Sequence, residues 1–294
     1  MDESTKVKEA IMNFINKCQD KKAAIVGAYR HFCIRGKKEH KITVDLFYDG
    51  PLPSDNPFTE LLELSDDKWI DHQTQGGADK KLAENFAFMD QLFSHIHDPS
   101  RVAGPPLHSP ISGTRLSLET YANNPPKAGV GEENVRARWG TVMVSHFTRK
   151  LLDKIEEESK RAASHMKDNQ GKTAVIDIWP FLPSMFDTST SAAWPHKKGR
   201  PNGPLLVCFQ WEGESNDKYW IGLLMEILQS IRKVAEDEGC TNDKLPIYCN
   251  TSLADTPVED IYKDHLSTLS KIRAKYDPDD MMRRTGGFRI PLAS

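Results

Sequence analysis

Ionisable side chains lie within a stretch that the sequence predicts to be a β-strand. The stretch Ala23–Ile34 has the sequence AAIVGAYRHFCI, and strand alternation puts Tyr29 and His31 on one face and Arg30 on the other. Polar groups on a buried strand need polar partners. Two interpretations are open: an edge strand with a wet face, or a pocket in which Tyr29 contacts a ligand and His31 transfers protons near neutral pH.

A second predicted strand, at 173–179 (TAVIDIW), carries a carboxyl group between apolar neighbours. Asp177 shares a face with Trp179 in this strand. A carboxyl group beside an indole on a sheet face can have a raised pKa and act as an acid or a base. A salt bridge is the structural alternative. We therefore predict a site in which His31 or Asp177 is catalytic and Trp179 binds the substrate.

Three further segments place polar side chains in positions typical of a pocket wall. The segment 193–199 (AWPHKKG) is either a surface loop with a structural tryptophan or a pocket lid that carries a histidine. In the predicted strand 204–211 (PLLVCFQW), one face is apolar and the other carries a cysteine and a glutamine. The segment 245–250 (LPIYCN) is predicted to be a short strand. The predicted substrate-binding residues in these segments are His196, Gln210, Tyr248 and Asn250.

The elements that must position these residues favour a single α+β domain over 1–294. We expect a mainly antiparallel sheet of about six or seven strands, covered by helices on one face, because helices and strands do not alternate strictly. The residues from 276 to 294 form a tail that is available to pack on a partner. Helices are predicted over 5–18, 58–64, 80–96, 147–167, 218–238 and 258–275, and strands over 23–34, 41–48, 139–145, 173–179, 204–211 and 245–250.

Composition excludes several classes of protein. Of the 294 residues, 38% are hydrophobic and 28% are charged, which is enough apolar material for a core and argues against a disordered chain. The balance of 39 Lys and Arg against 42 Asp and Glu argues against a nucleic-acid partner. A mean hydropathy of −0.56 and the charged N-terminus predict no membrane partner and a cytoplasmic location.

Motifs for metals and nucleotides are missing from the sequence. The five cysteines have no C-x-x-C spacing, so we predict reduced thiols and no metal site. The sequence contains no Walker A loop, no G-x-G-x-x-G, no G-x-S-x-G and no H-E-x-x-H. These motifs therefore give no support for nucleotide binding or for one of the well-known hydrolase sites.

Several short segments together resemble one family. They are AWPHKKG (193–199) with the strand that ends at Trp211, YCNT (248–251), YDP (276–278), GGF (286–288), and the turn DGP (49–51). Taken together, these segments resemble the berberine-bridge-type flavin oxidoreductases of the vanillyl-alcohol oxidase superfamily, with the fungal members most similar. The resemblance covers nearly the whole chain and corresponds to the family's substrate domain.

The resemblance also implies what this chain lacks. The family holds FAD mostly on a separate, preceding domain, whereas this sequence starts at Met1 with the substrate half, so we expect no cofactor unless a partner chain supplies an FAD domain. Thr251 stands where the family commonly has a catalytic tyrosine, and the family's upstream acidic residue aligns near Phe186 and Asp187. An unactivated hydroxyl is a weak base, so we predict Thr251 as a substrate-binding residue.

Three functions are compatible with these observations. The first is a flavin-independent enzyme of secondary metabolism, a cyclase (including a pericyclase such as a Diels–Alderase), isomerase or dehydratase, that binds a small hydrophobic polyketide, terpenoid or alkaloid intermediate. The second is the substrate-binding half of a split or truncated FAD-dependent oxidoreductase. The third is a non-catalytic binding module. In each case we expect a homodimer through the surface that an FAD domain would cover.

Overall fold

The computed structural model describes residues 3–34, 37–64, 135–186, 192–197, 199, 203–253, 255–282 and 289–292. The helix predicted at 80–96 lies outside the described residues, as does the GGF segment at 286–288. All further statements about the fold concern the described parts of the chain.

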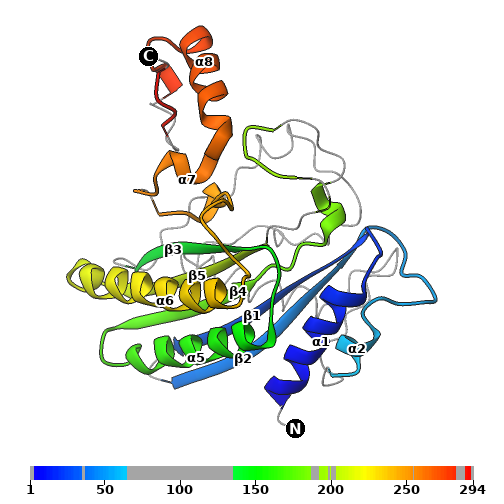
Figure 1. The fold of residues 1–294 in the computed structure, drawn as a ribbon. Helices are drawn as coiled ribbons and strands as arrows, with labels where there is room; N and C mark the ends of the chain where they lie inside the picture. The colour runs from blue at the N-terminus through cyan, green and yellow to red at the C-terminus, as the bar shows by residue number, and fades with distance from the viewer. Residues whose placement is uncertain are drawn as a thin grey trace, which may run out of the picture.

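Five antiparallel strands form one sheet in the order β2-β1-β4-β5-β3 (Figure 1). This confirms the predicted α+β class with an antiparallel sheet. The strand boundaries are β1 Ala23–Ile34, β2 Lys37–Tyr48, β3 Val135–Val144, β4 Gly171–Ile178 and β5 Gly203–Glu212.

The described strands are fewer than the predicted six or seven because the segment 245–250 is not a strand. Pro246 has no N–H to donate to a neighbouring strand. The N–H of Ile247 instead donates to the carbonyl of Asp260, and its carbonyl accepts from the Trp194 indole at 2.9 Å. A short 3-10 helix, η4 (Cys249–Thr251), follows.

The main helices begin and end close to the predicted residues. They are α1 Glu3–Lys17, α2 Thr59–Leu62, α5 Arg149–His165 and α6 Asp217–Asp237. The single helix predicted over 258–275 is wrong, because the chain turns at Lys263, which has a φ of 46°. The segment instead forms α7 Val258–Tyr262, η5 Lys263–His265 and α8 Leu266–Tyr276.

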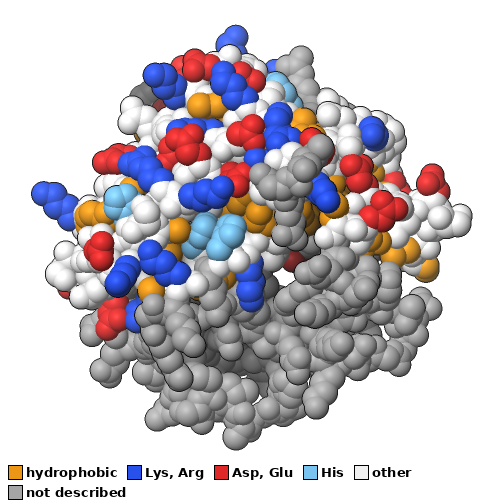
Figure 2. Space-filling view, turned by 90° about the horizontal axis from the view of Figure 1, so that it is seen from below, with side chains coloured by type: hydrophobic (Ala, Val, Ile, Leu, Met, Phe, Trp, Pro, Cys, Tyr) orange, Lys and Arg blue, Asp and Glu red, His pale blue; other side chains and the backbone are white. Residues whose placement is uncertain are grey.

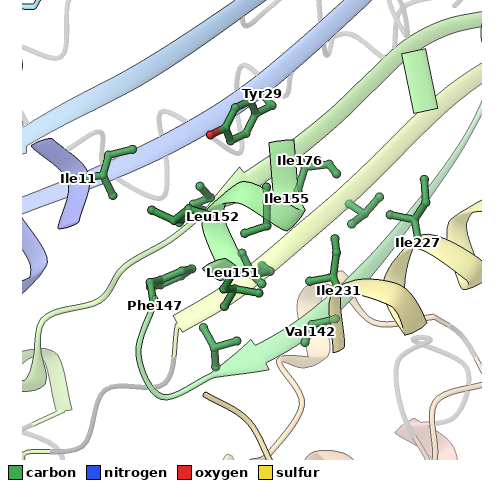
Figure 3. Close-up of a cluster of buried hydrophobic side chains, with 14 of the residues drawn as sticks. Ile11, Tyr29, Val142, Phe147, Leu151, Leu152, Ile155, Ile176, Ile227 and Ile231 are labelled. Atoms are coloured by element: carbon green, nitrogen blue, oxygen red, sulfur yellow. The ribbon is translucent and has the colours of Figure 1, made fainter. Parts of the chain in front are cut away.

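One face of the sheet is covered by α1, α5 and α6, and we call it the helix face (Figure 1). The strands and these three helices enclose the main hydrophobic core. Figure 3 shows Leu152 and Ile155 of α5 and Ile231 of α6 among these buried side chains, with Tyr29 of β1 in the same cluster. This apolar interface stabilises the domain and fixes the register of the sheet.

The opposite side of the sheet is called the distal face below. It carries the alternate residues of the same strands, and Phe32, Val175 and Cys208 form a small buried cluster there, with Trp139 packed against it. Arg30 is also buried, at 2% exposure. The distal face therefore combines apolar and charged side chains, whereas the helix face is mainly apolar.

The C-terminal helices lie at one end of the molecule, away from α5 and α6 (Figure 1). Tyr276 at the end of α8 and Met282 beyond it are 72% and 62% exposed.

No helix in the described ranges is long and apolar enough to cross a membrane. Basic and acidic side chains are interleaved on the surface seen in Figure 2.

Candidate functional site

A row of polar side chains crosses three strands of the distal face. Asp177 of β4 and Thr43 of β2 both lie opposite Ala28 of β1, one on each side. The small side chain of Ala28 leaves room for Arg30, whose Nε donates to Thr43 Oγ1 at 3.0 Å. Its Nη2 pairs with Asp45 Oδ2 at 3.4 Å. One buried guanidinium is therefore held by β2 and lies near two carboxyl groups.

Asp177 is the unusual member of this row. Its Oδ1 is buried and accepts no hydrogen bond from any described residue. The pKa of Asp177 is raised to about 6, mainly by burial; the charge of Arg30 lowers it, and the charge of Asp45 adds a smaller raising contribution. A carboxyl group with such a pKa is mostly ionised at neutral pH and still takes up a proton readily, as a general base must.

Trp179 follows Asp177 on the same face. Its indole Nε1 is buried and donates no hydrogen bond to any residue that the structure describes. A hydrogen-bond contribution from the Trp179 indole lowers the pKa of Asp177 slightly, the smallest of the four contributions, although this contact falls short of standard hydrogen-bond geometry. A buried donor and a buried acceptor thus lie side by side without full partners.

Aromatic rings extend from Trp179 towards the C-terminal segments. Ring centroids are 6.1 Å apart for Trp179 and Phe181, and 6.3 Å apart for Phe181 and Phe186. Phe186 in turn contacts both rings of the loop predicted as a pocket lid, at 6.0 Å and 5.3 Å. We call this set the aromatic row; its members are Trp179, Phe181, Phe186, Trp194, His196 and Tyr248.

The far end of the aromatic row carries four of the predicted binding residues. Tyr248 meets Trp194 edge to face at 6.3 Å, and its hydroxyl accepts a hydrogen bond of 2.8 Å from Asn250 Nδ2. Thr251 Oγ1 in η4 is buried and has no hydrogen-bond partner among the described residues. His196 stacks on Trp194 and contacts the carbonyl of that residue at 3.1 Å.

Two of the predicted residues lie on the other side of the sheet. His31 faces the helices, where its Nε2 hydrogen-bonds Ser159 Oγ at 2.5 Å and its ring stacks on His40 with centroids 4.4 Å apart. Burial, with smaller contributions from His40 and Lys160, lowers the pKa of His31 to about 4. Tyr29 is part of the hydrophobic core, and burial raises its pKa.

The structure therefore brings together most, but not all, of the predicted site. Asp177 and the aromatic row share one region, whereas His31 and Tyr29 contact helices on the opposite face. Gln210 lies on the distal face opposite Thr173, and it is separated from Asp177 by the apolar cluster of Val175 and Cys208. The predicted site is thus divided between the two faces of the sheet.

Sequence reasoning missed Asp45, Phe181 and Phe186 and gave no role to Arg30. Arg30 carried a usable signal, since a guanidinium on a buried strand requires an acidic partner from a neighbouring strand. The partner was in the predicted strand 41–48, where Asp45 falls on the same face as Thr43. The two phenylalanines lie in irregular chain after β4, where no periodicity indicates the direction of a side chain.

Comparison with known proteins adds the fold relationship. No family model matches the chain, and no curated protein sequence matches it. Among solved structures, it is similar to BBE-like 28 from Arabidopsis thaliana, with a TM-score of 0.55 and 14% identity over 99% of this chain and 55% of that one. It is also similar to a carbohydrate oxidase from Microdochium nivale, with a TM-score of 0.57 and 12% identity over 99% of this chain and 53% of that one. The chain shares the fold of one part of these oxidases.

A third match supports the same conclusion. It is 6-hydroxy-D-nicotine oxidase from Arthrobacter nicotinovorans, with a TM-score of 0.54 and 13% identity over 98% of this chain and 51% of that one. The chain spans about half the length of the solved structures that it matches. This confirms the predicted resemblance to berberine-bridge-type oxidases at the level of the fold.

The glycine turn before α6 does not fit the diphosphate of a flavin dinucleotide. A glycine turn leads from a strand into a long helix at Gly213, which has a φ of 81° and precedes α6. Glu214 and Asp217 occupy the start of this helix, and their charge repels an anion from its N-terminus. We therefore derive no step through a flavin held by this part of the chain.

Neither the cysteines nor the other potential metal ligands form a cluster in the described part of the chain. Each cysteine is a free thiol. Within the described ranges, no three His, Cys, Asp or Glu side chains are grouped so that they can hold a metal ion.

Proposed function

We propose that this protein is a flavin-independent enzyme that binds a small hydrophobic metabolite on the distal face and moves a proton with Asp177. The observation that carries the proposal is the Oδ1 atom of Asp177, which is buried without a hydrogen-bond partner among the described residues, on a carboxyl group with a pKa of about 6. Buried polar groups in native proteins are normally hydrogen-bonded, and we infer that a ligand completes this one.

The surroundings of Asp177 indicate the kind of ligand. Val175 and its apolar cluster lie on one side along β4, and Trp179 with the aromatic row lies on the other. Apolar walls with a few polar groups are typical of sites for small organic molecules. A polyketide, terpenoid or alkaloid intermediate has this chemistry, and the apolar walls would hold it in one orientation next to the carboxyl group.

Asp177 is a better candidate for the proton-transfer group than His31. The imidazole of His31 already bonds Ser159, and its pKa of about 4 leaves it neutral at physiological pH. Asp177 has a pKa of about 6, and its Oδ1 has no hydrogen bond of standard geometry from any described residue. Cyclisation, isomerisation and dehydration are the reactions that such a group supports without a redox cofactor.

The test is an anaerobic incubation of the full chain with a panel of apolar polyketide, terpenoid and alkaloid intermediates, without added cofactor, analysed by mass spectrometry. We expect a product of unchanged mass, or a mass lowered by one water. The product should disappear with Asp177→Asn and persist with Asp153→Asn, a matched change in a carboxyl of α5 that pairs with Lys8. Binding without a product would support a non-catalytic module instead.

A second candidate is the substrate-binding half of an FAD-dependent oxidoreductase whose flavin domain is on another chain. It is favoured by the match to about half of each oxidase and by the exposed side chains of Tyr276, Met281 and Met282. A product that has lost two hydrogens, formed only with a flavin-containing partner, would support it.

The exposed side chains of Tyr276, Met281 and Met282 also favour a homodimer. A light-scattering mass equal to that of one chain would contradict the homodimer.

A further inference from the structure

We propose that Asp177 and Trp179 form a site for enolisation of a carbonyl compound, with the Asp177 carboxylate as base and the Trp179 N–H as the donor to the oxygen. This inference rests on the proposed function and narrows it from several reactions to a proton shift next to a carbonyl group. It also assigns a substrate class, namely an apolar ketone or related carbonyl compound with an acidic C–H group beside it.

The argument starts from the unused hydrogen-bonding capacity on the distal face. Trp179 Nε1 can only donate, and it has no acceptor among the described residues, although it is buried. Asp177 Oδ1 is an acceptor when ionised, and it too is buried and unpartnered there. A ligand that satisfies both atoms must present an oxygen to the indole and a hydrogen to the carboxylate.

A carbonyl group with a neighbouring C–H group presents these two features on adjacent atoms. The two protein groups are close together, since residues two apart on a strand point to the same face and the indole influences the carboxyl group of Asp177. A hydroxyl group can also fill both positions, because it donates one hydrogen bond and accepts others. A carbonyl compound is the class on which the two groups can also act chemically, since the carboxylate can remove the neighbouring proton while the indole N–H stabilises the resulting oxyanion.

Arg30 keeps the base in its place in this arrangement. Its guanidinium is bound to Thr43 and Asp45, so it attracts the Asp177 carboxylate without a direct hydrogen bond to it in the structure. A direct bidentate ion pair would make the carboxylate a much weaker base. Because the Asp45 carboxylate partly neutralises the positive charge of Arg30, the Asp177 carboxylate remains basic enough to accept a proton.

The step is balanced within the site and needs no oxidant or reductant. Asp177 Oδ1 takes the proton, the electrons of the C–H bond form the C=C bond of the enolate, and the former carbonyl π pair moves to the oxygen. The Trp179 N–H stabilises the negative charge on that oxygen. The protonated Asp177 then returns the proton to the same carbon or to a conjugated one, and the second outcome is an isomerisation.

The experiment uses 2-tetralone, an apolar bicyclic ketone, as the probe. Exchange of its α-hydrogens for solvent deuterium is followed by proton NMR with the full chain in heavy water. We expect exchange above the buffer rate, and a loss of about 100- to 1000-fold with Trp179→Phe, which removes the N–H and keeps an aromatic ring. Asp177→Asn should reduce exchange about 100-fold or more.

Trp211→Phe is the matched control, because it makes the same change on the helix face, where the Trp211 indole donates to Asp217 at 2.9 Å. This variant should exchange 2-tetralone at nearly the wild-type rate. The wild-type rate should also rise with pH through about 6, as the carboxylate of Asp177 forms, and then level off. This pH profile tests the base even if Trp179→Phe fails to fold.

Two results separate failure of this inference from failure of the proposed function. Fluorescence titration with 2-naphthol, a flat apolar phenol, measures binding without turnover. If 2-naphthol binds and Asp177→Asn changes its affinity, but the wild-type chain does not accelerate exchange of 2-tetralone, enolisation is wrong and the metabolite site stands. If neither compound binds, both the inference and the proposed function are wrong. Equal exchange by Trp179→Phe and wild type overturns the role of the indole.

Discussion

The two faces of the sheet treat buried polar groups in opposite ways. Arg30 and His31 are neighbours on β1 and are both buried, but they point to different faces. On the helix face, His31 has a partner on α5 in Ser159. On the distal face, Asp177 and Trp179 keep an acceptor and a donor that no described residue satisfies. The comparison supports the proposal that one face stabilises the fold and the other holds the site.

The same difference is visible in the apolar side chains. On the helix face, residues of α1, α5 and α6 fill the space above the strands, as Figure 3 shows for Ile11, Leu151 and Ile227. On the distal face, apolar side chains occur as a small cluster and as the aromatic row, with charged groups between them. In the continuous core of the helix face, a substitution disturbs close packing and lowers the free energy of unfolding. On the mixed distal face, polar residues can be replaced at a lower cost in the free energy of unfolding.

The largest effect on stability is expected from Ile155→Ala on the helix face. Ile155 of α5 is fully buried, so the truncation leaves a cavity and should lower the free energy of unfolding by about 2–5 kcal/mol. Urea unfolding followed by circular dichroism measures this loss. The comparison predicts a smaller loss for Val175→Ala in the distal cluster, and an equal or larger one would contradict the division between the faces.

A pH-dependent loss of stability is expected from His31. Its pKa falls from 6.5 to about 4 on folding, so the unfolded chain takes up a proton at a higher pH than the folded chain does. Its contribution to stability is therefore complete above pH 6.5 and is lost as the pH falls towards 4. This amounts to about 3 kcal/mol at one pKa unit per 1.36 kcal/mol.

The variant His31→Gln isolates this contribution. It keeps a polar group that can bond Ser159 but does not titrate, so the difference between its stability and that of the wild type should shrink between pH 7 and pH 4. Chemical unfolding at several pH values measures the difference. A constant difference over this range would show that His31 is not held neutral by the helix face.

The opposite sign is expected on the distal face, where Asp177→Asn should stabilise the protein at alkaline pH. The pKa of Asp177 is raised from 3.8 to about 6 on folding, so ionisation opposes folding, and the penalty grows as the pH rises from about 4 to about 6. The gain from Asp177→Asn should be about 1–3 kcal/mol at pH 8 and close to zero at pH 4. Thermal or urea unfolding at the two pH values measures it.

The control for this prediction is Asp153→Asn on α5. Lys8 and Arg149 hydrogen-bond Asp153, which is why its pKa is lowered on folding despite partial burial. The substitution removes a favourable charge, so it should destabilise the protein at pH 8. If both Asp→Asn variants have the same sign, Asp177 is an ordinary structural carboxyl group and the proposed function loses its main support.

Much of the fold was predictable because it depends on local patterns. The strand Ala23–Ile34 was predicted with the boundaries that β1 has, since its alternation and β-branched residues are strong local signals. The register and strand order were not predictable, because they depend on which strands meet across the sheet. The false strand at 245–250 arose because apolar residues around Pro246 resemble a strand, while the backbone bonds of Ile247 go to α7 and to the Trp194 indole.

The candidate site was predicted in composition but not in arrangement. Trp179, His196, Tyr248 and Asn250 were predicted, and the structure connects them through ring contacts and a hydrogen bond that also involve Phe181, Phe186 and Trp194. Asp177 was also predicted and lies two residues before Trp179. The structure does not bring His31 and Asp177 together, because their side chains lie on opposite faces of the sheet. Alternation within each strand determines which residues share a face of that strand, but not which face of one strand continues into which face of the next.

By itself, the sequence determined the class of fold, the positions of most helices and strands, and which side chains alternate along each strand. These properties depend on hydrophobic periodicity and turn residues, which act over a few neighbouring positions. Only the tertiary structure decided that Arg30 lies near both Asp45 and Asp177, and that His31 is bound by a helix. Burial and the pairing of charges arise from contacts between residues far apart in the chain, so the proton affinity of Asp177 is a property of the folded sheet and not of the strand that carries it.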